Sequence, residues 1–246
     1  ISQEPPGYLP MTMGTGSYSE LEKKALYLQE KGRYVLGVAY GSHFEKANFC
    51  RGIENFLADL AGEPDYAERL LNEIIRKNMV MLENAVHFPL DGILLGSDWG
   101  SQQSMLMSPD VWRKMIKPGE VREYEVIKNA KKHVWIHSCG NIAQIIPDLV
   151  EMGVDVLNPM QPEVMDIFGI KDSHGERLSF WGGITTQRIL PYGTPAEVAK
   201  EAREVIQRMS RKGGYITAPS QDYQADVPYE NTLALLEEAR GFTRAF

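Results

Sequence analysis

Long apolar runs, cysteines and basic clusters are all scarce in this sequence of 246 residues. No run approaches the roughly 20 apolar residues that a membrane-spanning helix needs, so we expect no membrane span. The two cysteines, Cys50 and Cys139, are far apart and form no disulfide framework, which favours a cytoplasmic protein. A net charge of −7 without any basic run argues against a nucleic-acid partner.

The first residues also lack the features of a targeting segment. Residues 1–6 contain no starting methionine, basic region or apolar run, which excludes a signal peptide and predicts a chain that begins partway through a longer gene product. Residues 1–16 are rich in proline and glycine and predict a loop. We find no linker or internal repeat, so residues 1–246 predict one domain that is incomplete at its N-terminus.

Short apolar segments alternate with amphipathic helical segments along the chain. The predicted strands are residues 34–40, 91–96, 133–138, 154–158, 178–181 and 215–218. Such alternation is typical of βαβ units and a parallel sheet. A complete (β/α)8 TIM-type barrel takes about 250 residues and eight units. The sequence therefore predicts an α/β fold, a TIM-type barrel that lacks its first two strands in this chain or stays open.

Polar side chains recur just after these strands, and dinucleotide and phosphate-loop glycine motifs are absent. The residues concerned are His43, Asp98, His137 with Cys139, Asn158 with Gln161, Thr185 with Gln187 and Arg188, and Ser220 with Gln221 and Asp222. Active sites of parallel barrels are built at the carboxyl ends of the strands. This distribution favours a barrel over a doubly wound sheet and predicts the site at that end.

His137 and Cys139 are the most informative pair. Residues two apart on a strand point to one face, with Cα atoms about 6–7 Å apart, so an imidazole and a thiol could hold one metal ion. The alternative is a buried histidine beside an inert cysteine. Cys50, next to an apolar helical stripe, is expected in the core.

The other candidates each have a structural alternative. Asp98 could belong to the site or cap the next segment, and His43 could be functional or structural. Arg188, beside Gln187, could pair with a substrate carboxylate or with a surface acid. Gln221 could bind substrate or only fill space. Pro118-Gly119 should break or kink a helix.

Four segments carry a family resemblance, HVWIHSCGNI, VDVLNPMQPE, FWGGITTQRILPYGTPAEV and YITAPSQDYQADVPYEN. They resemble the uroporphyrinogen decarboxylase superfamily, which includes methylcobalamin:coenzyme M methyltransferases, and the resemblance runs from about Tyr34 to the C-terminus. It implies a (β/α)8 barrel. The decarboxylase branch is metal-free and carries Gly-His-Gly where this chain has Pro219-Ser220-Gln221. The methyltransferase branch binds zinc through His-x-Cys, matched by His137-Ser138-Cys139, and through a second Cys that would fall near Gln221.

The resemblance thus implies zinc-assisted methyl transfer between a methylcorrinoid and a thiol or another acceptor, with Asp98, Asp222 or a residue outside this sequence as a substitute third ligand. The partner would be a corrinoid protein or a small tetrapyrrole, and the chain could form a homodimer. The expected roles are metal binding by His137 and Cys139, catalysis by Asp98, Gln221 and His43, and cofactor binding by Asn158, Gln187 and Arg188. The alternatives are a metal-free decarboxylase of a carboxylated tetrapyrrole and a non-catalytic barrel that binds a ligand.

Overall fold

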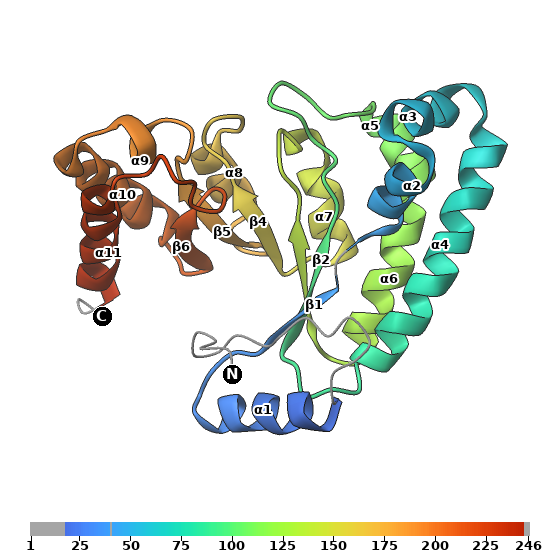
Figure 1. Cartoon of the computed structure of the whole chain (residues 1–246), viewed down its shortest axis with the longest axis horizontal. Coiled ribbons are helices and arrows are strands. Elements are labelled where there is room, and N and C mark those ends of the chain that lie inside the picture. The colour runs from blue at the N-terminus through green and yellow to red at the C-terminus, as the bar shows by residue number, and fades with distance from the viewer. Residues whose placement is uncertain (1–17, 40, 244–246) are drawn as a thin grey trace.

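A parallel sheet of six strands forms the centre of the molecule (Figure 1). The structure is a computed structural model that describes residues 18–39 and 41–243, so the predicted loop over residues 1–16 lies outside the described part. The strands are β1 (Leu36–Ala39), β2 (Gly92–Gly96), β3 (His133–His137), β4 (Val156–Met160), β5 (Ser179–Ile184) and β6 (Tyr215–Pro219). All six predicted strands are confirmed, with shifts of a few residues at their ends.

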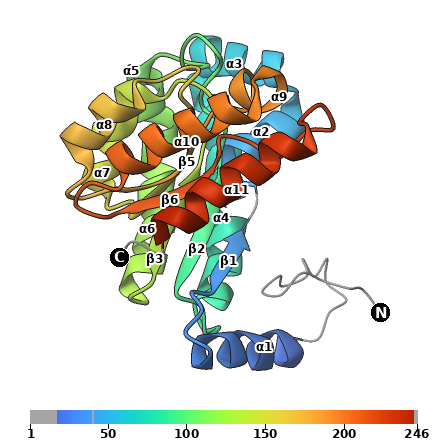
Figure 2. The same ribbon diagram turned by 90° about the vertical axis from the view of Figure 1, so that its left-hand side faces the viewer.

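The strands lie side by side in chain order, β1 to β6, and every neighbouring pair is parallel. Helical segments connect them, as a TIM-type barrel requires. Among the described strands β1 pairs only with β2 and β6 only with β5, so this sheet is curved but not closed (Figure 2). The fold of the described residues is therefore the predicted α/β barrel type, with a parallel sheet of six strands.

The helices precede, connect and follow these strands. They are α1 (Tyr18–Glu30), α2 (His43–Arg51), α3 (Ile53–Gly62), α4 (Pro64–Ala85), α5 (Pro109–Val111), α6 (Lys117–Asn129), α7 (Ile146–Met152), α8 (Ile167–His174), α9 (Ile189–Tyr192), α10 (Pro195–Met209) and α11 (Tyr229–Thr243), with a 3-10 turn at Ala143–Ile145. No helix in the described part of the chain is both long and apolar enough to cross a membrane.

Alternation along the strands separates two apolar surfaces. Side chains such as Ile93, Val134 and Phe180 point toward the helices and join the main core. On the opposite face a small cluster of strand side chains packs together, and we call it the inner face; it consists of Leu36, Leu94, Trp135, Val156 and Trp181. The helical layer therefore covers only one side of the sheet.

Two local predictions need correction. Cys50 is exposed rather than buried, because it lies in the last turn of α2 on the side away from the core. Pro118-Gly119 does not break the helix, because α5, a π-helical turn over Trp112–Ile116 and α6 follow one another without a gap. The Lys117 N–H bonds to the Trp112 carbonyl five residues back, so the wider π-helical turn lies directly before the proline, whose missing N–H would interrupt an ordinary α-helix.

Candidate metal-binding site

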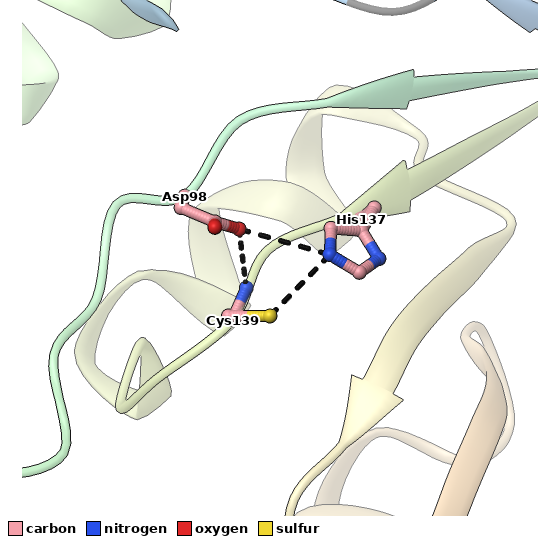
Figure 3. Close-up of side chains that lie close together, drawn as sticks. All are labelled: Asp98, His137 and Cys139. Carbon is pink, nitrogen blue, oxygen red and sulfur yellow. Dashed lines mark hydrogen bonds and ion pairs between the residues drawn. The ribbon is translucent and has the colours of Figure 1, made fainter. Parts of the chain in front are cut away.

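Asp98, His137 and Cys139 come together at the carboxyl ends of β2 and β3 (Figure 3). His137 is the last residue of β3, Cys139 follows two residues later, and Asp98 follows β2. One potential ligand atom from each residue lies within 4.8 Å of the other two. The structure thus brings together the predicted metal pair and one of the two predicted substitutes for the absent second cysteine.

Backbone hydrogen bonds continue past the strand ends and hold the loops in place. Ser97 donates its N–H to the His137 carbonyl at 2.9 Å, and Trp99 donates its N–H to Ser138 Oγ at 3.2 Å. The Trp99 side chain is fully buried and packs edge-on against Trp112. Asp98, between Ser97 and Trp99, is therefore fixed in the direction of β3.

Glycine allows the two loops to touch. Gly140 has φ of +81°, and a Cβ on it would collide with the backbone of Gly100. The neighbouring Asn141 donates its N–H to the Ser101 carbonyl at 2.8 Å. This close approach lets Asp98 Oδ1 accept a hydrogen bond from the Cys139 N–H at 2.8 Å.

Asn158 on β4 orients the imidazole of His137. Its Oδ1 lies 2.6 Å from His137 Nδ1, while its Nδ2 donates to the Trp181 carbonyl at 3.4 Å. An amide oxygen only accepts, so Nδ1 carries the proton and Nε2 keeps its lone pair. Nε2 lies 3.4 Å from Cys139 Sγ and 3.7 Å from Asp98 Oδ1. Such an outer hydrogen bond is what fixes the tautomer of a metal-binding histidine.

The thiol of Cys139 is neutral when no cation is near. Burial and, to a smaller extent, the nearby Asp98 carboxylate raise the pKa of the Cys139 thiol to about 11. A metal cation favours the thiolate instead. Sulfur, nitrogen and carboxylate oxygen are all zinc donors, so this set of three fits a zinc ion with one position left for another ligand.

Gln221 and Glu45 lie next to the three donor side chains Asp98, His137 and Cys139. Gln221, just after β6, donates its Nε2–H to Cys139 Sγ at 3.2 Å, close to where the family would place a second cysteine. Glu45 on α2 is half-buried, and burial together with the nearby Asp98 carboxylate raises its pKa. The sequence patterns did not single out Glu45. It lies two residues after His43, in the helix that follows β1, and this position after a strand could have indicated it.

The remaining predicted site residues lie elsewhere. His43 is fully buried between helices, and its closest acids are Glu120 and Glu123 rather than Asp98. Its side chain points away from the carboxyl ends because it begins α2 on the face that packs against α6. It is therefore not brought together with His137 and Cys139.

The expected cofactor contacts at Gln187 and Arg188 are also not part of this cluster. Arg188 is exposed and donates to Glu201 at 3.0 Å, which is the surface ion pair weighed as its alternative. The Gln187 backbone N–H donates to Glu163 at 3.1 Å. Asp222, the other proposed substitute ligand, is exposed, and its N–H donates to Gln221 Oε1 at 3.0 Å. It is not one of the three clustered donors, although its carboxylate lies near enough to Cys139 to raise the pKa of the thiol.

A pocket of about 580 Å³ lies at the opposite end of the sheet. Its lining includes His133, Ser179 and Tyr215, which are the first residues of β3, β5 and β6. The amino ends of barrel strands usually serve stability, whereas catalysis occurs at the carboxyl ends. The pocket is therefore separate from the cluster at His137.

Comparisons with known proteins agree with the family resemblance and with the fold. The sequence model of a family described as uroporphyrinogen decarboxylase (URO-D) matches residues 23–242. A curated relative, the methylated-thiol–coenzyme M methyltransferase of Methanosarcina mazei, is 21% identical over 207 residues, or 82% of this chain and 51% of the relative. The chain thus spans about half the length of the curated relative it matches.

A solved structure described as a methyltransferase from Methanosarcina mazei superimposes with a TM-score of 0.69. The superposition covers 93% of this chain and 65% of that chain, at 20% identity. At this identity the likeness concerns the fold, and it agrees with the barrel-type arrangement of strands and helices.

Proposed function

Because the chain belongs to the uroporphyrinogen decarboxylase family, we propose that it takes part in methyl transfer from a methylcorrinoid to a thiol, at a zinc site formed by Asp98, His137 and Cys139. The observation that supports this most is the convergence of three donor atoms within 4.8 Å at the carboxyl ends of the strands. The name of the curated relative, which mentions a methylated thiol and coenzyme M, points to thiol chemistry of the same kind.

Each of these residues would have its own role at the proposed zinc site. His137 and Cys139 would bind the ion, His137 through Nε2 because Asn158 occupies Nδ1. Asp98 would supply the third donor and hold the Cys139 backbone. Zinc bound there would lower the pKa of a coordinated substrate thiol.

The reaction itself is a methyl displacement. The substrate thiol loses its proton to solvent, its sulfur forms the new carbon–sulfur bond, and the cobalt–carbon bond of the methylcorrinoid breaks with its electron pair left on cobalt. Glu45 and Gln221 lie beside the donor atoms and would orient the thiol substrate or its proton.

The test measures zinc and methyl transfer on the same preparations. Purified chain should hold about one zinc ion at this site, and it should transfer methyl groups from methylcobalamin to 2-mercaptoethanesulfonate. His137→Ala should lose methyl transfer and hold one zinc equivalent fewer than the parent chain, whereas His87→Ala, at an exposed histidine, should match the parent in both. Undiminished methyl transfer in His137→Ala would exclude the mechanism, and carbon dioxide release from a porphyrinogen in the presence of a chelator would favour a decarboxylase.

A further inference from the structure

A second group of metal-binding side chains lies behind the first site, between helices α2 and α6. It consists of His43, Glu120 and Glu123, whose potential ligand atoms all lie within 4.8 Å of one another. His43 is 0% exposed, Glu120 1% and Glu123 0%. No substrate-sized molecule reaches this position, so any role must be structural.

The tautomer of His43 leaves one ring nitrogen available. Its Nε2 lies 3.2 Å from the carbonyl oxygen of Ile116, the last residue of the π-helical turn. A carbonyl only accepts, so Nε2 carries a proton. Burial by itself lowers the pKa of His43, but Glu123 and Glu120 outweigh it and raise the pKa, so a cation that binds between the carboxylates would displace the proton from Nδ1. Gly119 packs so tightly on the ring that a Cβ there would be 2.8 Å from it. Nδ1 itself has no hydrogen-bond partner.

Nδ1 faces both carboxylates at distances that suit ligands of one ion. It lies 3.6 Å from Glu120 Oε1 and 3.7 Å from Glu123 Oε1. These separations exceed the roughly 3.2 Å limit of an N–H···O hydrogen bond. Two tetrahedral donors bound to one ion at about 2.0–2.1 Å are instead roughly 3.3–3.4 Å apart, so only a small contraction would bring these atoms to binding distance.

The buried carboxylates lack sufficient compensation from the protein. Both oxygens of Glu120 and Oε2 of Glu123 lack a hydrogen bond of good geometry. The nearby Tyr124 hydroxyl, which lowers the pKa of Glu120, does not form one either. Glu123 Oε1 accepts a hydrogen bond from Asn78 Nδ2 at 2.8 Å. The ammonium group of Lys46 donates to Asn78 Oδ1 and not to a carboxylate. Burial raises the pKa of Glu120 to about 7, with His43 acting in the opposite direction. Buried charge of this kind is normally paired or bound to a metal.

We propose that His43, Glu120 and Glu123 bind one divalent transition-metal ion of the zinc class, which fastens α2 to α6. Imidazole with carboxylates suits such an ion, and a Glu120 that binds through both oxygens would bring the donor atoms to four. The hydrogen bond from Nε2 to Ile116 and that from Asn78 to Glu123 would form the outer shell of the site. The ion would anchor the start of α2, which also carries Glu45 toward the first site.

The test uses a double variant, His137→Ala with Cys139→Ser, which removes two donors of the first site. Zinc uptake by this variant therefore reports on the second site alone, whether or not the proposed function is correct. After treatment with a chelator, this double variant should take up one equivalent of added Zn²⁺. At a hundredfold excess over Kd, its Tm should rise by about 5–10 °C. Added Mg²⁺ should give no comparable rise, because Mg²⁺ keeps several of its own waters and is not held in an all-protein cage.

Glu120→Gln in the same background should abolish zinc uptake, and its Tm without metal should not fall, because one buried charge is removed. The matched control is Glu125→Gln, an exposed position on the same helix, which should bind zinc normally. X-ray absorption at the zinc edge of the double variant should show imidazole and oxygen ligands without sulfur, and it remains informative if Glu120→Gln does not fold. Absence of zinc uptake by the double variant would overturn the proposal and leave His43 as an imidazolium between two carboxylates.

Discussion

At the scale of single residues, the contact between Gln221 and Cys139 differs from the zinc site that the resemblance to the methyltransferases implies. The side-chain amide of Gln221 reaches the sulfur at 3.2 Å from the loop after β6. An amide nitrogen donates but does not bind a metal cation. At the proposed zinc site, the atom of Gln221 that faces the sulfur would therefore not act as a metal ligand.

Gln221→Glu should therefore strengthen zinc binding, because a carboxylate of the same length replaces the amide beside the sulfur. We expect an affinity about tenfold higher, which corresponds to about 1.4 kcal/mol. Competition with a chromophoric chelator measures it. Gln207→Glu, at an exposed glutamine on α10, is the control and should leave the affinity unchanged. Equal affinity of Gln221→Glu and the parent chain would contradict the placement of Gln221 at the site.

At the scale of elements, the Asp148 carboxylate on α7 binds Arg113 of the π-helical turn and Lys117 at the start of α6. Arg113 donates two hydrogen bonds to its carboxylate, through Nε and Nη2, and Lys117 donates one at 2.8 Å. Burial by itself raises the pKa of Asp148, but the hydrogen bonds from Arg113 and Lys117 outweigh it and hold the pKa below its ordinary value. The bridge therefore stabilises the folded chain while Asp148 is ionised.

Asp148→Asn should reduce the free energy of unfolding at pH 7 by about 1 kcal/mol, a modest figure because both cations are partly solvated. The folded-state pKa is below the unfolded one, so this contribution is complete above about pH 4 and is lost as the pH falls through the folded pKa. Urea unfolding of both proteins at several pH values measures the difference. Asp110→Asn, at an almost fully exposed partner of Arg113, should change little. A difference that persists unchanged at pH 2.5 would contradict this explanation.

At the scale of the whole molecule, the two faces of the sheet differ in how they are packed. Leu94 and Leu95 are neighbours on β2 and point to opposite faces. Leu95 is 2% exposed and belongs to the main core beneath the helices, whereas Leu94 is 7% exposed and belongs to the inner face. The inner face has fewer buried partners, because the described strands do not close into a cylinder.

Leu95→Ala should consequently cost more stability than Leu94→Ala, since a cavity enclosed on all sides cannot be filled by solvent. We expect losses of about 4 kcal/mol and about 2 kcal/mol, near the two ends of the usual range for such changes. Urea unfolding of the two variants gives the comparison, with each serving as the control for the other. An equal or larger loss for Leu94→Ala would mean that the inner face is as tightly packed as the main core.

Much of this architecture follows from local sequence. Apolar strands alternating with amphipathic helices specify the parallel sheet, because residue periodicity decides which side chains can be buried together. The capping box at Thr194 and Glu197 and the left-handed Gly153 mark helix ends in the same local way. His137 and Cys139 are two residues apart, so their proximity needs little more than the strand end itself.

Only the tertiary structure decided which distant residues join them. Asp98 reaches Cys139 from another strand end, and Asn158 selects the tautomer of His137 from β4. His43 follows a strand as Asp98 does, yet the packing of α2 on α6 turns it toward Glu120 and Glu123. Position after a strand is a property of the sequence, whereas the direction of a side chain depends on the helices and loops that pack around it.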